Sequence, residues 1–209
     1  MVELGKSILH GIITYVLCPW EGTSLQRIVD LVDHQVIATV RSEDHMREAI
    51  ASKANVIFLL FGNILNLEEM MEQAALAGKS VFLHLEFLEG IAADRSGIHY
   101  IARNLRPAGI ISTRSQVIGM ARDCGLLAIQ RLFLIDSTAL KNGIRMIHAS
   151  GADAVEVMPG IVPHMISELT ALTELPIVAG GLIRKKEEID VALRSGALAV
   201  SVGDPLLWH

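Results

Sequence analysis

Polar residues and glycines follow the short apolar runs of this sequence, at the points where the runs end. These positions are Arg41, Asn63, His84, Glu86, Ser112, Thr113, Arg114, Gln130, Arg131, Glu156, Gly160, Gly180, Gly181, Ser201 and Gly203. A guanidinium group binds oxyanions through a fork of N–H donors, and a carboxylate accepts hydrogen bonds from hydroxyl groups. Core packing does not require polar residues at these points, so the pattern predicts a binding site for a small polar anion.

The C-terminal segment, residues 175–208, gives the clearest sign of a phosphate site. Two apolar runs in this segment end in glycine, the first at Gly180-Gly181 and the second at Gly203. Glycine lets backbone N–H groups approach a ligand closely, and a (β/α)8 barrel often binds phosphate in the loops after its last two strands. We therefore expect phosphate near Gly180, Gly181, Ser201 and Gly203, although tight turns alone would also use these glycines.

Other chemistry at the same positions has less support. His84 and Glu86 would share one face of a strand and could hold a metal, but no second histidine ends a strand, and no lysine stands where a Schiff-base enzyme needs one. Glu86 and Glu156 would act either as acid and base or as acceptors for a polyol. Arg114 and Arg131 would either bind anionic oxygens or pair with these carboxylates. We expect no catalytic residue, metal or cofactor.

These positions share a location only if the chain forms a regular barrel. Eight apolar runs alternate with segments of helical pattern, at residues 36–40, 56–61, 81–87, 109–113, 126–132, 154–158, 176–179 and 197–202. Glycines that end helices precede several runs, and no hairpin signal interrupts the alternation. The sequence thus predicts a single-domain α/β fold, a (β/α)8 TIM-type barrel over residues 35–209, with an open doubly wound sheet as the alternative.

Composition limits the class of protein. The chain has 209 residues, 51% of them hydrophobic, which favours one domain with a large core. No apolar run reaches the roughly 20 residues of a membrane span, and the two cysteines, Cys18 and Cys124, fit reduced thiols in the cytoplasm. A formal net charge of −5 argues against nonspecific nucleic-acid binding through a general positive field, but it permits a local basic patch.

Residues 1–34 form an extension ahead of the barrel. The sequence Thr23-Ser-Leu-Gln26 matches a capping box and predicts a helix to about Val32. The segment lacks the charged start and cleavage site of a signal peptide. Two roles stay open for it, a plug over the bottom of the barrel or a contact in a homo-oligomer.

Four runs of sequence resemble one known family. They are GIISTRS (residues 109–115), AIQRLFLIDS (128–137), VEVMPGIVPHMI (155–166) and PIVAGGLIR (176–184). In this order they are similar to the glycerol-3-phosphate-responsive antiterminator family, whose members are small (β/α)8 barrels. The resemblance runs from about Val36 to Trp208. It implies a regulator that binds glycerol 3-phosphate and then the mRNA leader of glycerol-catabolic genes, preventing termination of transcription.

The resemblance and the strand-end pattern together define the expected site. The ligand-binding residues we expect are Arg41, Glu86, Ser112, Arg114, Gln130, Glu156, Gly160, Gly180, Gly181, Ser201 and Gly203. The basic run Arg184-Lys185-Lys186 is either a solvated helix start or a contact with RNA. Ligand binding would order the loop at residues 89–97 and so favour the RNA-binding state.

Besides the segment before Gln35, which has no recognised counterpart in the family, the chain departs from the family pattern at two places. It has His84-Leu-Glu86 where the family usually has His-x-Asp, and Ser201-Val202-Gly203-Asp204 where the family tends to Ser-Thr-Ser. Backbone donors can still hold a phosphate at the second place, but two hydroxyl groups are lost. The alternatives are an enzyme acting on a small phosphorylated substrate, and a phosphate-ligand sensor that acts through a protein partner.

Overall fold

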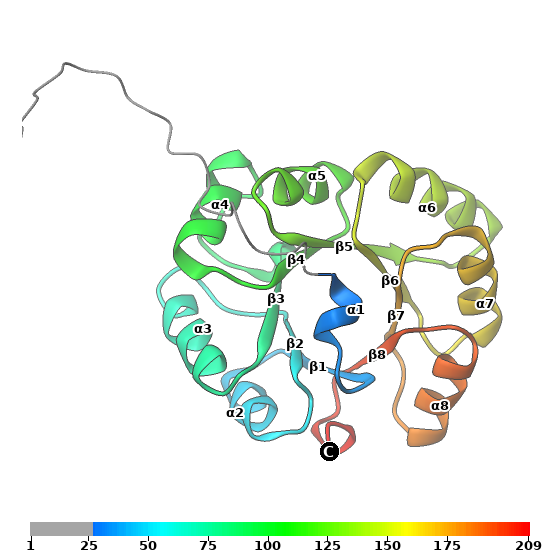
Figure 1. The fold of residues 1–209 in the computed structure, drawn as a ribbon, viewed down its shortest axis with the longest axis horizontal. Coiled ribbons are helices and arrows are strands. Elements are labelled where there is room, and N and C mark those ends of the chain that lie inside the picture. Colours follow the sequence, from blue (N-terminus) through cyan, green and yellow to red (C-terminus); the bar gives the residue numbers. More distant parts are fainter. Residues whose placement is uncertain (1–26) are drawn as a thin grey trace, which may run out of the picture.

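The computed structural model describes residues 27–209, which form a closed barrel of eight parallel strands in the order β1 to β8 (Figure 1). The barrel predicted from the sequence is therefore confirmed, and the open sheet is excluded. The strands are β1 (Val36–Val40), β2 (Val56–Leu59), β3 (Ser80–His84), β4 (Gly109–Ser112), β5 (Leu127–Phe133), β6 (Ala154–Met158), β7 (Ile177–Gly180) and β8 (Ala199–Val202).

Helices surround the barrel and connect successive strands. They are α2 (Glu43–Ala51), α3 (Leu67–Leu76), α4 (Arg95–Tyr100), α5 (Ser115–Asp123), α6 (Ser137–Ser150), α7 (Pro163–Leu172) and α8 (Lys186–Arg194). Three single turns complete the order, a 3-10 turn at Leu85–Phe87, a π turn at Ile101–Leu105 and a 3-10 turn at Pro205–Leu207. None of the helices within residues 27–209 is long and apolar enough to cross a membrane.

The strands are mainly apolar because both of their faces are buried. One face packs against the helices, where Met70 and Met71 of α3 are buried in the same cluster as Leu59 of β2. The other face fills the barrel, where Phe58 and Phe82 meet edge to face with ring centroids 5.8 Å apart. This two-sided burial matches the short continuous apolar runs of the sequence.

A short helix, α1 (Ile28–Leu31), lies over the middle of the barrel in Figure 1. Ile28 and Leu31 are buried in the same cluster as the residues inside the barrel. Asn55, which precedes β2, donates a hydrogen bond to the carbonyl of Leu31. This described part of the extension packs on the bottom of the barrel. The capping box at Thr23–Gln26 lies outside the described residues.

Candidate functional site

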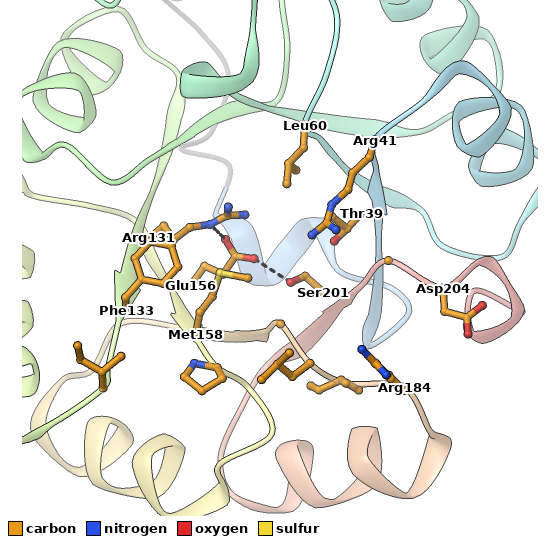
Figure 2. A pocket seen from close by; sticks show the side chains of 16 residues that line it. Thr39, Arg41, Leu60, Arg131, Phe133, Glu156, Met158, Arg184, Ser201 and Asp204 are labelled. Carbon is orange, nitrogen blue, oxygen red and sulfur yellow. Dashed lines mark hydrogen bonds and ion pairs between the residues drawn. The ribbon is translucent and has the colours of Figure 1, made fainter.

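A cavity of about 590 Å³ opens where the strands end, on the face where (β/α)8 barrels carry their binding sites (Figure 2). Residues from the ends of β1, β2, β5, β6 and β8 and from the loop after β7 line it. They are Thr39, Arg41, Leu60, Arg131, Phe133, Ile135, Glu156, Met158, Pro159, Gly181, Leu182, Ile183, Arg184, Ser201, Gly203 and Asp204.

A buried chain of polar contacts lies at the base of this cavity. Arg131 Nε donates to Glu156 Oε2 at 2.6 Å, and Ser201 Oγ donates to Glu156 Oε1 at 2.8 Å (Figure 2). Arg131 and Glu156 are directly paired in the register of β5 and β6. The Arg131 and Glu156 side chains are 4% and 1% exposed, so each charge depends on the other. Of the two roles considered for Arg131, pairing with a carboxylate is the one observed.

Gly180 makes room for this chain of contacts. A Cβ atom at this position would lie 2.5 Å from Ser201 Oγ and 2.7 Å from Glu156 Oε1. The absence of a side chain therefore lets the hydroxyl and the carboxylate meet beside β7. Gly180 supports the site from behind, whereas the next glycine, Gly181, lines the cavity itself.

Two arginines present unpaired guanidinium groups to the cavity. Arg41 follows β1 and Arg184 follows β7, and both are exposed. Within residues 27–209 neither side chain forms an ion pair, although the backbone N–H of Arg184 donates to the Glu188 carboxylate. Asp204 is the carboxylate at the rim, and it accepts a hydrogen bond from the backbone of Leu206. The cavity therefore has cationic groups free to bind an anion.

Thr39 is a cavity residue that the sequence analysis did not single out. It is 6% exposed, and its hydroxyl makes no hydrogen bond with another side chain or backbone group of the described chain. A signal was present, because Thr39 is the polar residue within an otherwise apolar strand and lies two residues after Ile37 and two before Arg41. Residues two apart on a strand point to the same side.

A second polar cluster, outside the lining of the main cavity, surrounds Glu86. The backbone N–H of Thr113 and the hydroxyl of Ser112 donate to Glu86 Oε1 at 3.0 and 2.5 Å, and Arg114 Nε lies 3.5 Å from the same oxygen. His84 Nδ1 lies 3.0 Å from Glu86 Oε2. Neither Glu86 nor Arg114 lines the main cavity, so the structure places both beside it.

The expectation that His84 and Glu86 share one strand face is wrong. Strand β3 ends at His84, and Glu86 lies in the 3-10 turn that follows. The turn is closed by a hydrogen bond from the backbone of Leu88 to that of Leu85, and it carries the Glu86 carboxylate toward β4. No group of three or more metal-ligating side chains occurs in the part of the chain that the structure describes.

Three further expected residues also lie outside the cavity lining. Ser112 and Gln130 are fully buried, and each follows by two positions a residue that faces the helices. The Gln130 amide donates to the carbonyl of Thr113 at 3.0 Å, which ties β5 to the end of β4. Gly160 packs against the backbone of β7, where its N–H donates to the carbonyl of Gly180. The expected residues that do line the cavity are Arg41, Glu156, Gly181, Ser201 and Gly203, together with Arg184 of the basic run.

The loss of stability at acidic pH should depend in part on Glu86. Burial raises the pKa of this carboxyl, but the adjacent His84 ring and the hydrogen bond from the Ser112 hydroxyl outweigh burial and hold the pKa well below its usual range. A pKa lower in the folded than in the unfolded state stabilises the fold above the unfolded value, near 4.3, and this contribution is lost as the pH falls. We therefore expect the difference in free energy of unfolding between wild type and Glu86→Gln to be largest above about pH 5 and to shrink below it.

Urea denaturation at a series of pH values measures this difference. Glu68→Gln, at an exposed position in α3, serves as the matched control and should change stability little at any pH. A constant difference between wild type and Glu86→Gln across the acid range would contradict the assignment.

The fold and the cavity define a class of protein, a small closed (β/α)8 barrel with a cavity at the strand ends that two unpaired arginines line. Residues 36–208 match the family described as glycerol-3-phosphate responsive antiterminator, and the chain belongs to this family. The family predicted from the sequence is therefore confirmed.

Three relatives show how widely this similarity extends. The uncharacterized protein YgcP of Escherichia coli (strain K12) is 31% identical over 178 residues, which cover 85% of this chain and 93% of that protein. The crystal structure of the glycerol uptake operon antiterminator regulatory protein from Listeria monocytogenes is 32% identical, with a TM-score of 0.81 over 84% of this chain and 95% of that one. A glycerol uptake operon antiterminator-related protein from Thermotoga maritima is 29% identical, with a TM-score of 0.74 over 83% and 96% of the two chains.

Proposed function

We propose that this protein is a cytoplasmic, ligand-gated RNA-binding antiterminator. It binds glycerol 3-phosphate and, in that state, the mRNA leader of genes for glycerol uptake and catabolism. Membership of the antiterminator family supports this function. The observation that carries the ligand part is the pair of unpaired arginines, Arg41 and Arg184, at one cavity with a buried carboxylate at its base.

The two ends of glycerol 3-phosphate match two parts of the cavity. The phosphate would lie between the Arg41 and Arg184 guanidinium groups, beside the backbone of Gly181 and Gly203. The hydroxyl groups would donate to Glu156, whose oxygens accept hydrogen bonds from Arg131 and Ser201 and retain further lone pairs.

The expected residues outside the cavity have a supporting role in this proposal. They hold the neighbouring strand ends in place through the contacts described above, and they are Glu86, Ser112, Arg114, Gln130, Gly160 and Gly180. Arg114 is thus a useful comparison for Arg41, because both are exposed arginines at strand ends and only Arg41 lines the cavity.

The proposed link to RNA runs through the start of α8. Arg184 lines the cavity, and Lys185 and Lys186 follow it at exposed positions. The carboxylate of Glu188 accepts hydrogen bonds from the backbone N–H groups of Arg184 and Lys185, so this turn is one bonded unit. A phosphate that binds Arg184 would favour one arrangement of the turn, and with it one placement of the two lysines. No residue of the loop at 89–97 lines the main cavity, so we propose this route in place of that loop.

Calorimetric titration with glycerol 3-phosphate tests the ligand part. Arg41→Ala and Arg184→Ala should each weaken binding about 10- to 100-fold, because a hydrogen bond to a charged group contributes roughly 1.5–3 kcal/mol. Arg114→Ala should leave the affinity within about twofold. Equal losses in all three variants would contradict the assigned site. Chemical turnover of the ligand during the titration would favour the enzyme alternative.

The RNA part predicts a steep salt dependence that requires the ligand. With glycerol 3-phosphate present, a plot of log affinity for the leader RNA against log salt should flatten by about 0.7–0.9 for each of Lys185→Ala and Lys186→Ala. Lys141→Ala, an exposed lysine of α6, serves as the control and should leave the slope unchanged. If the slope is unchanged in both variants, the start of α8 does not contact the RNA.

A further inference from the structure

Three apolar residues of the cavity lining are exposed to solvent. Phe133, Ile135 and Leu182 are 56%, 83% and 61% exposed, and all three line the cavity. They come from the end of β5 and from the loops after β5 and β7, and we call them the apolar wall. Large apolar side chains gathered at one site, and left in water there, often mark a binding surface.

Other parts of the lining are polar and cationic. In Figure 2, Phe133 and Met158 lie on one side together with Arg131, which is paired with Glu156, whereas Thr39, Arg41 and Arg184 lie on the other side with Leu60. The cavity therefore joins an anion-binding side to an apolar side. A molecule that fills both must have a phosphate or similar anion at one end and an apolar group at the other.

Leu182 carries two unfavourable features at once. Its backbone is left-handed, with φ +64°, a conformation that is uncommon for residues other than glycine and asparagine, and its side chain is 61% exposed. Such backbone strain tends to occur at ligand-binding sites. The strained turn directs an apolar side chain to the cavity, where a bound apolar group would cover it.

The size and chemistry of the cavity narrow the choice of apolar group. A volume of about 590 Å³ is in the range of pockets that hold drug-sized molecules, far larger than a three-carbon phosphate. Phe133 is the aromatic residue of the lining, and Ile135, Leu182 and Ile183, which also line the cavity, are aliphatic. A flat nucleobase would find few hydrogen-bond partners on such a surface, whereas a flexible aliphatic chain needs none.

We propose that the cavity takes a phosphate monoester with an aliphatic chain of several carbons, such as a short-chain acyl glycerol phosphate. The phosphate binds between Arg41 and Arg184, and the chain lies along the apolar wall. This proposal rests on the proposed function, because it uses the same phosphate position and extends the ligand class from glycerol 3-phosphate to its acyl esters.

A ligand series with one head group tests the proposal. Glycerol 3-phosphate, its 1-butanoyl ester and its 1-hexanoyl ester are titrated into the full chain by calorimetry, below their micelle concentrations. Burial of one methylene group can raise affinity by up to about fourfold, so the hexanoyl ester should bind at least about tenfold more tightly than glycerol 3-phosphate.

Variants of the apolar wall show where the acyl chain of the ligand binds. Ile135→Ser and Leu182→Asn should bring the ratio of the hexanoyl-ester affinity to the glycerol 3-phosphate affinity close to one. Asparagine is chosen at position 182 because it also tolerates the left-handed backbone. Leu76→Ser, at a 90% exposed leucine of α3, is the matched control and should change neither affinity.

Each result distinguishes this proposal from the one on which it rests. If glycerol 3-phosphate binds and the acyl chain adds no affinity, only the extension to acyl esters is overturned. If no member of the series binds, the proposed function is overturned as well. An equal gain with adenosine 5′-monophosphate would replace the aliphatic chain by an aromatic base. If the protein sediments as a dimer and Ile135→Ser dissociates that dimer, the apolar wall is a contact between two copies of the protein, and the proposal is overturned.

Discussion

Replacement of Glu156 by alanine is expected to lower the free energy of unfolding by about 3–5 kcal/mol, the typical loss when one member of a buried ion pair is removed. The Arg131 guanidinium, 4% exposed, would keep its charge and lose the carboxylate 2.6 Å away. The hydroxyl of Ser201 would lose its acceptor as well. For a domain of this size, the midpoint of thermal unfolding should fall by about 6–20 °C.

Two comparisons isolate the unpaired charge as the cause. Asp44→Ala removes one partner of an exposed ion pair with Arg47 on α2, and it should change stability by less than about 1 kcal/mol. The double variant Arg131→Met/Glu156→Leu removes both charges and should recover most of the stability. If Glu156→Ala yields no folded protein, Glu156→Gln provides the measurable variant. A loss no greater than that of Asp44→Ala would show that the buried pair is not a stabilising element.

Gly180→Ala is the second change with a large expected effect. The new methyl group would lie within 2.7 Å of both the Ser201 hydroxyl and the Glu156 carboxylate, so their hydrogen bond could not persist in its present geometry. Overpacking and the lost hydrogen bond together should lower the free energy of unfolding by about 2–4 kcal/mol. Binding of glycerol 3-phosphate should weaken too, because the Glu156 carboxylate would be displaced.

Gly203→Ala is the matched control for Gly180→Ala. Gly203 also ends a strand at this face, but a Cβ atom there would meet no other group within 4 Å. Its effect on stability, measured by the same urea titration, should stay within about 0.5 kcal/mol. Similar losses in the two variants would mean that contact with Glu156 and Ser201 is not the reason for glycine at position 180.

The sequence was sufficient to predict the barrel and the face on which the cavity opens. Strands β1 and β6 begin and end where the sequence predicted, and the other six strands differ from prediction by a few residues at one or both ends. The reason is that apolar runs and helix-ending glycines are local signals. Gly151, for example, ends α6 in the left-handed conformation just before β6.

The division of the polar strand ends between cavity and surroundings was decided by tertiary structure. Gln130 and Arg131 are neighbours in sequence, yet Gln130 contacts the end of β4 and Arg131 enters the cavity. Successive residues of a strand point to opposite faces, and this alternation follows from the local sequence. When both faces of a strand are apolar, however, the sequence does not show which face points into the barrel.

The position of Glu86 was also a tertiary outcome. Its carboxylate accepts hydrogen bonds from Ser112 and Thr113, more than 25 residues further along the chain. Glu86 is the middle residue of a 3-10 turn that the apolar run did not reveal. The sequence by itself therefore determined the fold, its family and the face of the site. Closure of the barrel decided which arginines pair with a carboxylate and which stay free to bind an anion, because these contacts join strands that are distant in sequence.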